Sequence, residues 1–164
     1  MPLYTGGQLE RQIKSANFGL TSTDLTLENT RQAVKFQTVQ SYYQVLQRKN
    51  LMKVRQEELN NLNEHLRVVQ IQYDVGNVAM SDVIETKVQI VNSRQGLNTI
   101  RGDYENAVAT LKNIIGLPTD TPLAVSDNLD YLPHEESEIE CLEYALEHRP
   151  DGIAAIYEIK RVEA

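Results

Sequence analysis

The chain has 164 residues, a length typical of one or at most two domains. Hydrophobic residues make up 41% and charged residues 24%, which excludes a chain that is disordered by composition. No uncharged apolar run approaches the ~18 residues of a membrane-spanning helix, and the sequence shows no signal-peptide pattern. The one cysteine, Cys141, excludes an internal disulfide framework and a cysteine-rich zinc site.

The net charge of −7 is unevenly distributed along the chain. Residues 1–116 hold 13 Lys and Arg against 11 Asp and Glu, whereas residues 117–164 hold 3 against 12. The first part is therefore balanced and the second is strongly acidic. Because nucleic-acid binding needs a basic face, this distribution argues against a nucleic-acid partner.

The first element is a long helix. No proline occurs between Pro2 and Pro118, and proline inside a helix costs ~3 kcal/mol. We expect a helix from about Gln8 to Tyr73, roughly 100 Å long at 1.5 Å per residue. The segment Gly19–Asp24 has poor helix propensity, so a break and a later start there stay open.

A turn at Asp74–Asn77 then separates two series of apolar residues spaced seven apart. The series before the turn is Val45, Met52, Leu59, Leu66 and Tyr73. The series after it is Val83, Ile90, Leu97, Tyr104 and Leu111, interleaved with Thr86, Ser93, Ile100, Ala107 and Ile114. Two heptad seams joined by a short turn predict an antiparallel coiled-coil hairpin whose second helix spans about residues 81–115.

Gly116 and Pro118 end this second helix, and a proline-rich linker follows. Within the linker, Leu123–Val125 is a candidate short strand. Helices are then expected over residues 138–149 and 151–163. The last helix carries Ile153, Ile156 and Ile159, for which the sequence offers no packing partner. The apolar residues in the first half of the long helix also have no partner. We therefore expect the sequence to be part of a longer protein.

The predicted fold class is therefore all-α. An elongated antiparallel coiled-coil hairpin of one long and one shorter helix occupies residues 1–116. A proline-rich linker and short helices occupy residues 117–164.

The sequence offers no recognisable catalytic or metal site. His65, His134 and His148 lie far apart, and none has a second ligand at the spacing of a zinc-binding helix. Cys141 has no nearby histidine, and a cysteine on an apolar helix face is usually a packing residue. No glycine pattern fits a phosphate loop. We expect a protein that is not an enzyme and has no cofactor and no metal.

The sequence resembles the TolC-type outer-membrane efflux proteins at four places in register. Gln72–Val83 resembles the periplasmic tip of that family, where an aromatic residue precedes a glycine and an aspartate. Pro2–Gly7 resembles the passage from a barrel strand into the first long helix, and Leu111–Pro118 resembles the end of the shorter helix. Ala145–Asp151 resembles the start of the family's second repeat, although Gly152 replaces the aliphatic residue that usually follows.

The resemblance implies a multidrug efflux or secretion channel that is not an enzyme. Family members are homotrimers with a β-barrel in the outer membrane and an α-helical barrel through the periplasm. They export small molecules or proteins together with a periplasmic adaptor and an inner-membrane pump. This chain is then a periplasmic tunnel segment of an outer-membrane protein, and it touches the membrane only through barrel strands that it lacks. Residues 1–116 are the tunnel hairpin, and residues 117–164 are an equatorial linker and the start of the second repeat.

Two groups of residues are the candidate sites under this resemblance. The adaptor-docking tip is Val75, Gly76, Asn77, Val78 and Ala79. A local alternative is a turn that needs only Gly76, with Val78 packed against it. Ser81 and Asp82 are candidates for closing the tunnel entrance or for capping the second helix.

Two other classes of protein remain open at this point. A periplasmic adaptor also uses a long helical hairpin, but lipoyl-like β-rich halves flank it, whereas this chain has helix and a proline-rich linker. A coiled-coil scaffold is the third class.

Overall fold

The computed structural model describes residues 7–126, 133 and 136–164, which form four helices and no strand. These are α1 (Gln8–Asp74), α2 (Met80–Ile114), α3 (Glu138–His148) and α4 (Pro150–Glu163). The all-α prediction is confirmed, and the bounds of both long helices lie within one residue of those expected. Chain packing defines two units, residues 1–36 with 130–164, and residues 37–129.

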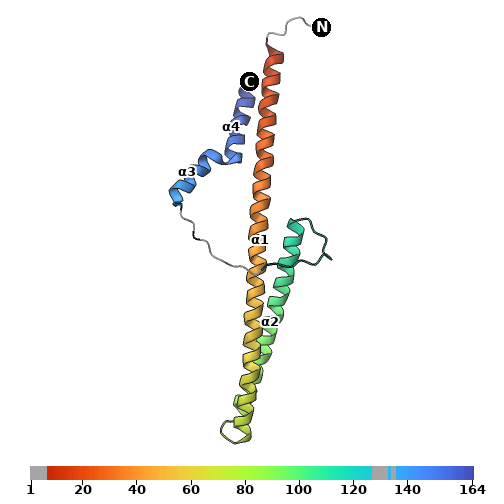
Figure 1. Ribbon diagram of the computed structural model, residues 1–164, viewed down its shortest axis with the longest axis vertical. Helices are drawn as coiled ribbons and strands as arrows, with labels where there is room; N and C mark the ends of the chain where they lie inside the picture. Colours follow the sequence, from red (N-terminus) through yellow and green to blue (C-terminus); the bar gives the residue numbers. More distant parts are fainter. Residues whose placement is uncertain (1–6, 127–132, 134–135) are drawn as a thin grey trace. The chain divides into compact units, whose positions relative to one another are not determined.

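In the unit of residues 37–129, α2 runs back along α1 from a tight turn (Figure 1). The buried residues of α2 follow the predicted heptads, since Val83, Ile90, Leu97 and Leu111 are all buried. Leu59 of α1 packs with Ile90 and Leu97, and Met52, Leu62 and Leu66 lie against this cluster. The hairpin is therefore held by the two seams that the sequence repeats every seven residues.

Small polar residues occupy the same interface near the turn. Thr86 is buried, and its hydroxyl donates to the Asp82 carbonyl oxygen at 2.9 Å. The Ser93 hydroxyl oxygen is buried and has no hydrogen-bond partner. Further from the turn, Arg48 and Asp103 form an ion pair of 3.7 Å between the two helices. The partly exposed ion pair adds little energy but favours this antiparallel alignment.

The linker after α2 lies against α1 as an extended segment and not as a strand. The Lys49 ammonium donates to the Val125 carbonyl at 3.3 Å, and the Tyr42 hydroxyl donates to the Ser126 carbonyl at 3.2 Å. Leu123 and Val125 are half-buried while Ala124 is exposed, which is the alternation of a strand. The candidate strand at Leu123–Val125 does not form, since the described residues hold no second strand and the Val125 carbonyl is bound by the Lys49 side chain instead.

The possible break at Gly19–Asp24 does not occur, because α1 is continuous through this segment. The hydroxyls of Thr21 and Thr23 donate to the carbonyls of Asn17 and Gly19, four residues earlier, at 3.1 and 2.9 Å. A hydroxyl bonded in this way remains inside the helix and does not cap a new one.

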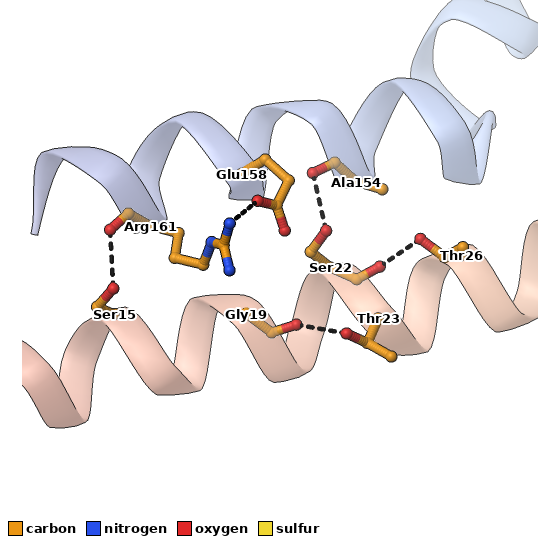
Figure 2. A network of polar contacts seen from close by, with 8 residues as sticks. All are labelled: Ser15, Gly19, Ser22, Thr23, Thr26, Ala154, Glu158 and Arg161. Atoms are coloured by element: carbon orange, nitrogen blue, oxygen red, sulfur yellow. Dashed lines mark hydrogen bonds and ion pairs between the residues drawn. The ribbon is translucent and has the colours of Figure 1, made fainter.

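In the unit of residues 1–36 and 130–164, α4 packs antiparallel on α1 through hydroxyl groups (Figure 2). The Ser15 hydroxyl donates to the Arg161 carbonyl at 2.9 Å, and the Ser22 hydroxyl donates to the Ala154 carbonyl at 3.4 Å. Ser15 and Ser22 are seven residues apart on α1, and Ala154 and Arg161 are seven residues apart on α4. This contact therefore also follows a seven-residue repeat.

The apolar side chains that the sequence analysis found unpaired mostly stay exposed. Ile156 and Ile159 of α4 are exposed, because α4 presents Ala154 and Tyr157 to α1 instead. The exposed apolar residues of the first half of α1 include Leu9, Ile13, Leu20, Leu27, Val34, Val39 and Tyr43. This chain therefore covers only part of its own apolar surface.

The hairpin core gives a first prediction. Leu97→Ala removes a buried side chain between α1 and α2, and we expect it to lower the free energy of unfolding by about 2–5 kcal/mol. Urea unfolding followed by circular dichroism measures this change. Val91→Ala is the matched control, because Val91 lies on the same helix with 62% of its surface exposed, and its effect should stay below about 0.5 kcal/mol. Equal effects of the two variants would contradict the proposed seam.

The start of α3 gives a second prediction, on pH. The Ser137 amide and hydroxyl donate to the Glu140 carboxylate, each at 2.8 Å, which holds the pKa of Glu140 below its ordinary value. This stabilisation is complete above the unfolded pKa of about 4.3 and is lost as the pH falls through the lower folded pKa.

We therefore expect the Ser137 amide resonance in NMR spectra to titrate below pH 4.3, together with loss of helicity in α3. Glu140→Gln keeps an acceptor at this position, so it should remove the titration at Ser137 and retain the helix. Glu143→Gln is the control for general acidification. A Ser137 titration that persists in Glu140→Gln would contradict the assignment.

Candidate functional site

The turn between α1 and α2 is built by a backbone pattern that requires glycine. The Asn77 amide donates to the Gln72 carbonyl at 2.8 Å, and the Gly76 amide donates to the Tyr73 carbonyl at 2.9 Å. These two bonds form a Schellman motif, whose central residue adopts a positive φ. Gly76 has φ of +79°, whereas Asn77 does not take a positive φ. One glycine therefore ends α1 and starts the chain reversal.

The five predicted tip residues all lie in this turn, between the end of α1 and the start of α2. Val75 has 65% of its surface exposed, and Gly76, Asn77 and Ala79 are also exposed. Val78 is half-buried, as expected for a residue that packs under the turn. The structure therefore brings the five together and leaves four of them accessible.

The apolar surface extends beyond the predicted tip onto both helices. Ile71, Met80 and Ile84 are exposed on either side of the turn. The heptad pattern does not predict these three residues, because none of them belongs to a seam. An apolar residue outside the seams is the sequence feature that could have identified them, since its side chain points away from the partner helix.

Asp82 caps the start of α2 from its third position. Its carboxylate accepts a hydrogen bond from the Ala79 amide at 3.2 Å, and the Ser81 hydroxyl donates to the same carboxylate at 3.3 Å. Ala79 stands at the N-cap and has no side-chain acceptor, so only this half of a capping box exists. Asp82 therefore caps the second helix by reaching back to the amide of the N-cap residue Ala79.

An unfavourable charge stands at the end of α1. Asp74 is the last residue of that helix, whose last turn has no basic residue. A carboxylate at a helix C-terminus meets the negative end of the helix dipole. The Gln70 side-chain amide donates a hydrogen bond to the Asp74 carboxylate at 3.4 Å. Residues that are locally unfavourable in this way are often found at functional sites. Asp74 is therefore a further candidate residue at the turn.

The candidate metal ligands of the sequence form no cluster among the described residues. Among them, no three His, Cys, Asp or Glu side chains gather closely enough to hold a metal ion. His65 is exposed, the His148 ring stacks on Tyr144 at 4.0 Å, and His134 lies outside the described residues. Cys141 is exposed and not packed, contrary to expectation. Within residues 7–126 and 136–164, no helix combines the length and apolar character needed to span a bilayer.

Comparison with known proteins decides which family this hairpin comes from. Residues 1–117, which include all of α1 and α2, match the family described as "Outer membrane efflux protein". The chain belongs to this family. The resemblance seen at the turn and at the helix ends is thereby confirmed, and so is the expected localisation to the outer membrane.

Two curated proteins are similar to the chain over most of its length. Outer membrane efflux protein BepC of Brucella suis is 26% identical over 135 residues, covering 81% of this chain and 30% of BepC. Outer membrane protein TolC of Escherichia coli is 22% identical over 129 residues, covering 78% of this chain and 26% of TolC. The chain thus spans less than a third of either relative. No solved structure matches it.

Proposed function

We propose that the chain is a periplasmic tunnel segment of a trimeric outer-membrane channel for efflux or secretion. In this proposal residues 1–116 form the tunnel hairpin, and residues 117–164 form an equatorial linker and the start of a second repeat. Membership of the outer membrane efflux protein family supports the general function, and it favours a channel over an adaptor or a coiled-coil scaffold. The family consists of transport proteins, which supports a role other than catalysis.

The observation that carries the proposal is the α1–α2 hairpin with an exposed apolar turn. A packed pair of long helices is a stiff element, because its seams fix the register of the two helices over their shared length. A stiff hairpin suits the wall of a tunnel. Its exposed apolar side chains at the turn suit contact with another protein, since exposed apolar patches mark interaction sites.

The residues of the turn indicate which partner the hairpin would contact. We assign the docking of a periplasmic adaptor, which links the channel to an inner-membrane pump, to Val75, Gly76, Asn77, Val78 and Ala79. The exposed Val75, Met80 and Ile84 provide apolar contact area around the turn. Gly76 and Ala79 have little side chain, so a partner backbone can approach closely there. Small residues flanked by apolar ones are well suited to packing against a second helical tip.

A substitution at the tip tests this docking. We expect Val75→Glu in the complete protein to weaken adaptor binding about tenfold, because it loses an apolar contact worth ~1.5 kcal/mol. Adaptor affinity and dye efflux from cells that lack their own channel protein are the two measurements. Val91→Glu is the matched control on the side of α2. Normal efflux and affinity in Val75→Glu would refute docking at the turn.

Asp82 is proposed to have a second role besides its cap, in keeping the tunnel entrance closed. We expect Asp82→Ala to raise the ion conductance of the reconstituted complete channel several-fold, and to lower the stability of the first turn of α2 by about 1 kcal/mol. Single-channel recording and amide exchange measure the two effects. Glu85→Ala, in the same region of α2, is the control. Faster amide exchange with unchanged conductance would show that Asp82 only caps α2 and would refute its role in closing the entrance.

A further inference from the structure

A second buried face runs along α1 beside the seam that packs against α2. Val45 and Leu46 are neighbours in the sequence, and both side chains are fully buried. Successive residues of an α-helix point about 100° apart, so these two side chains face different directions. Val45 belongs to the seven-residue series along which α1 packs on α2. Leu46 lies off that series and therefore needs a different cover.

Two polar side chains bracket Leu46 on the same face of α1. Tyr42 precedes it by four residues and Lys49 follows it by three, and residues at these spacings are neighbours on a helix surface. The Tyr42 hydroxyl donates to the Ser126 carbonyl at 3.2 Å. The Lys49 ammonium donates to the Val125 carbonyl at 3.3 Å. The linker is therefore bound by donors on either side of Leu46.

The linker turns its apolar side chains inward. Leu123 and Val125 are half-buried, whereas Pro122, Ala124 and Ser126 are exposed. This alternation is that of an extended chain, in which successive side chains point to opposite sides. The inner side of the linker is therefore apolar, as a cover for a leucine requires.

The start of the linker is bound to α2. Gly116 has φ of +70° where α2 ends, and the Leu117 amide donates to the Lys112 carbonyl at 2.9 Å. The Lys112 ammonium donates to the Thr119 carbonyl at 2.8 Å. The described part of the linker is thus attached to α2 near its start and to α1 near its end, within the unit of residues 37–129.

We propose that Tyr42 and Lys49 are positioning residues, which hold the linker over Leu46 and thereby fix the point where the chain leaves the hairpin. The contact completes the burial of Leu46 and gives the segment after Ser126 one fixed origin on α1. The bond from Lys49 is charge-assisted, and such bonds are stronger than neutral ones. This contact is separate from the turn between α1 and α2, and it does not depend on adaptor docking there or on closure of an entrance.

Thiol accessibility at position 46 tests the proposal in the complete protein, with Cys141→Ser and no other cysteine present. Leu46→Cys should react slowly with a maleimide. Adding Tyr42→Phe and Lys49→Met keeps the ring and the aliphatic chain but removes both donors. We expect the reaction to become at least tenfold faster, because the linker no longer covers the thiol. Lys49→Arg in place of Lys49→Met keeps a cationic donor and should return most of the protection.

Matched controls separate release of the linker from opening of the hairpin. Tyr43→Phe with Lys35→Met removes an exposed hydroxyl and an exposed ammonium from the same helix, and it should leave the rate at position 46 unchanged. Val83→Cys replaces a fully buried residue of the seam near the turn. It should react slowly in every background, because α2 packs on α1 there and the linker does not reach it.

Substitutions in the linker give the reciprocal test. Val125→Gly removes a half-buried side chain and should also speed the reaction at position 46, whereas Ala124→Gly, at the exposed neighbouring position, should not. An unchanged rate at position 46 after the Tyr42 and Lys49 substitutions would overturn the proposal. An equal increase at position 83 would overturn it too, since the hairpin itself would then have opened.

Discussion

The seven-residue repeat shared by α1 and α2 is the constraint on which the other features of residues 37–129 depend. Because side chains at this spacing return to the same helix face, Leu59 meets Ile90 and Leu97 only when the two helices run antiparallel and in one register. That register sets where the chain must reverse. It therefore fixes the position of the turn, of the exposed apolar residues around it and of Asp82 at the start of α2.

The reversal of the chain between α1 and α2 depends on one glycine. Gly76 takes a positive φ and ends α1 without strain, so α2 can begin four residues later at Met80. Between them, Asn77 and Ala79 are exposed while Val78 is half-buried under the turn. A surface of this kind at the end of a stiff helix pair is available for a partner, which is the basis of the proposed docking role.

The sequence predicted the helices and the turn because both depend on local patterns, namely the absence of proline, the heptad spacing and one glycine. It did not predict contacts that depend on distant groups. Lys49 and Tyr42 bind the carbonyls of Val125 and Ser126, which converts an expected strand into an extended segment. Ala154 and Tyr157, and not Ile156 or Ile159, face α1 because Ser15 and Ser22 bind carbonyls of α4. At the turn, the position of the chain reversal and its glycine were predicted, whereas the exposed Met80 and Ile84 beside it were missed because they lie outside the seams.

The antiparallel register of α1 and α2 is the central claim, and pulsed electron resonance tests it directly. Spin labels at cysteines replacing Arg48 and Asp103, in a Cys141→Ser background, should lie within about 20 Å, since packed helices are about 8–10 Å apart. A label pair at positions 48 and 77 should be about 40 Å apart, which is the length of α1 between these positions. A separation of 48 and 103 beyond about 40 Å, as expected if α2 does not fold back along α1, would contradict the account.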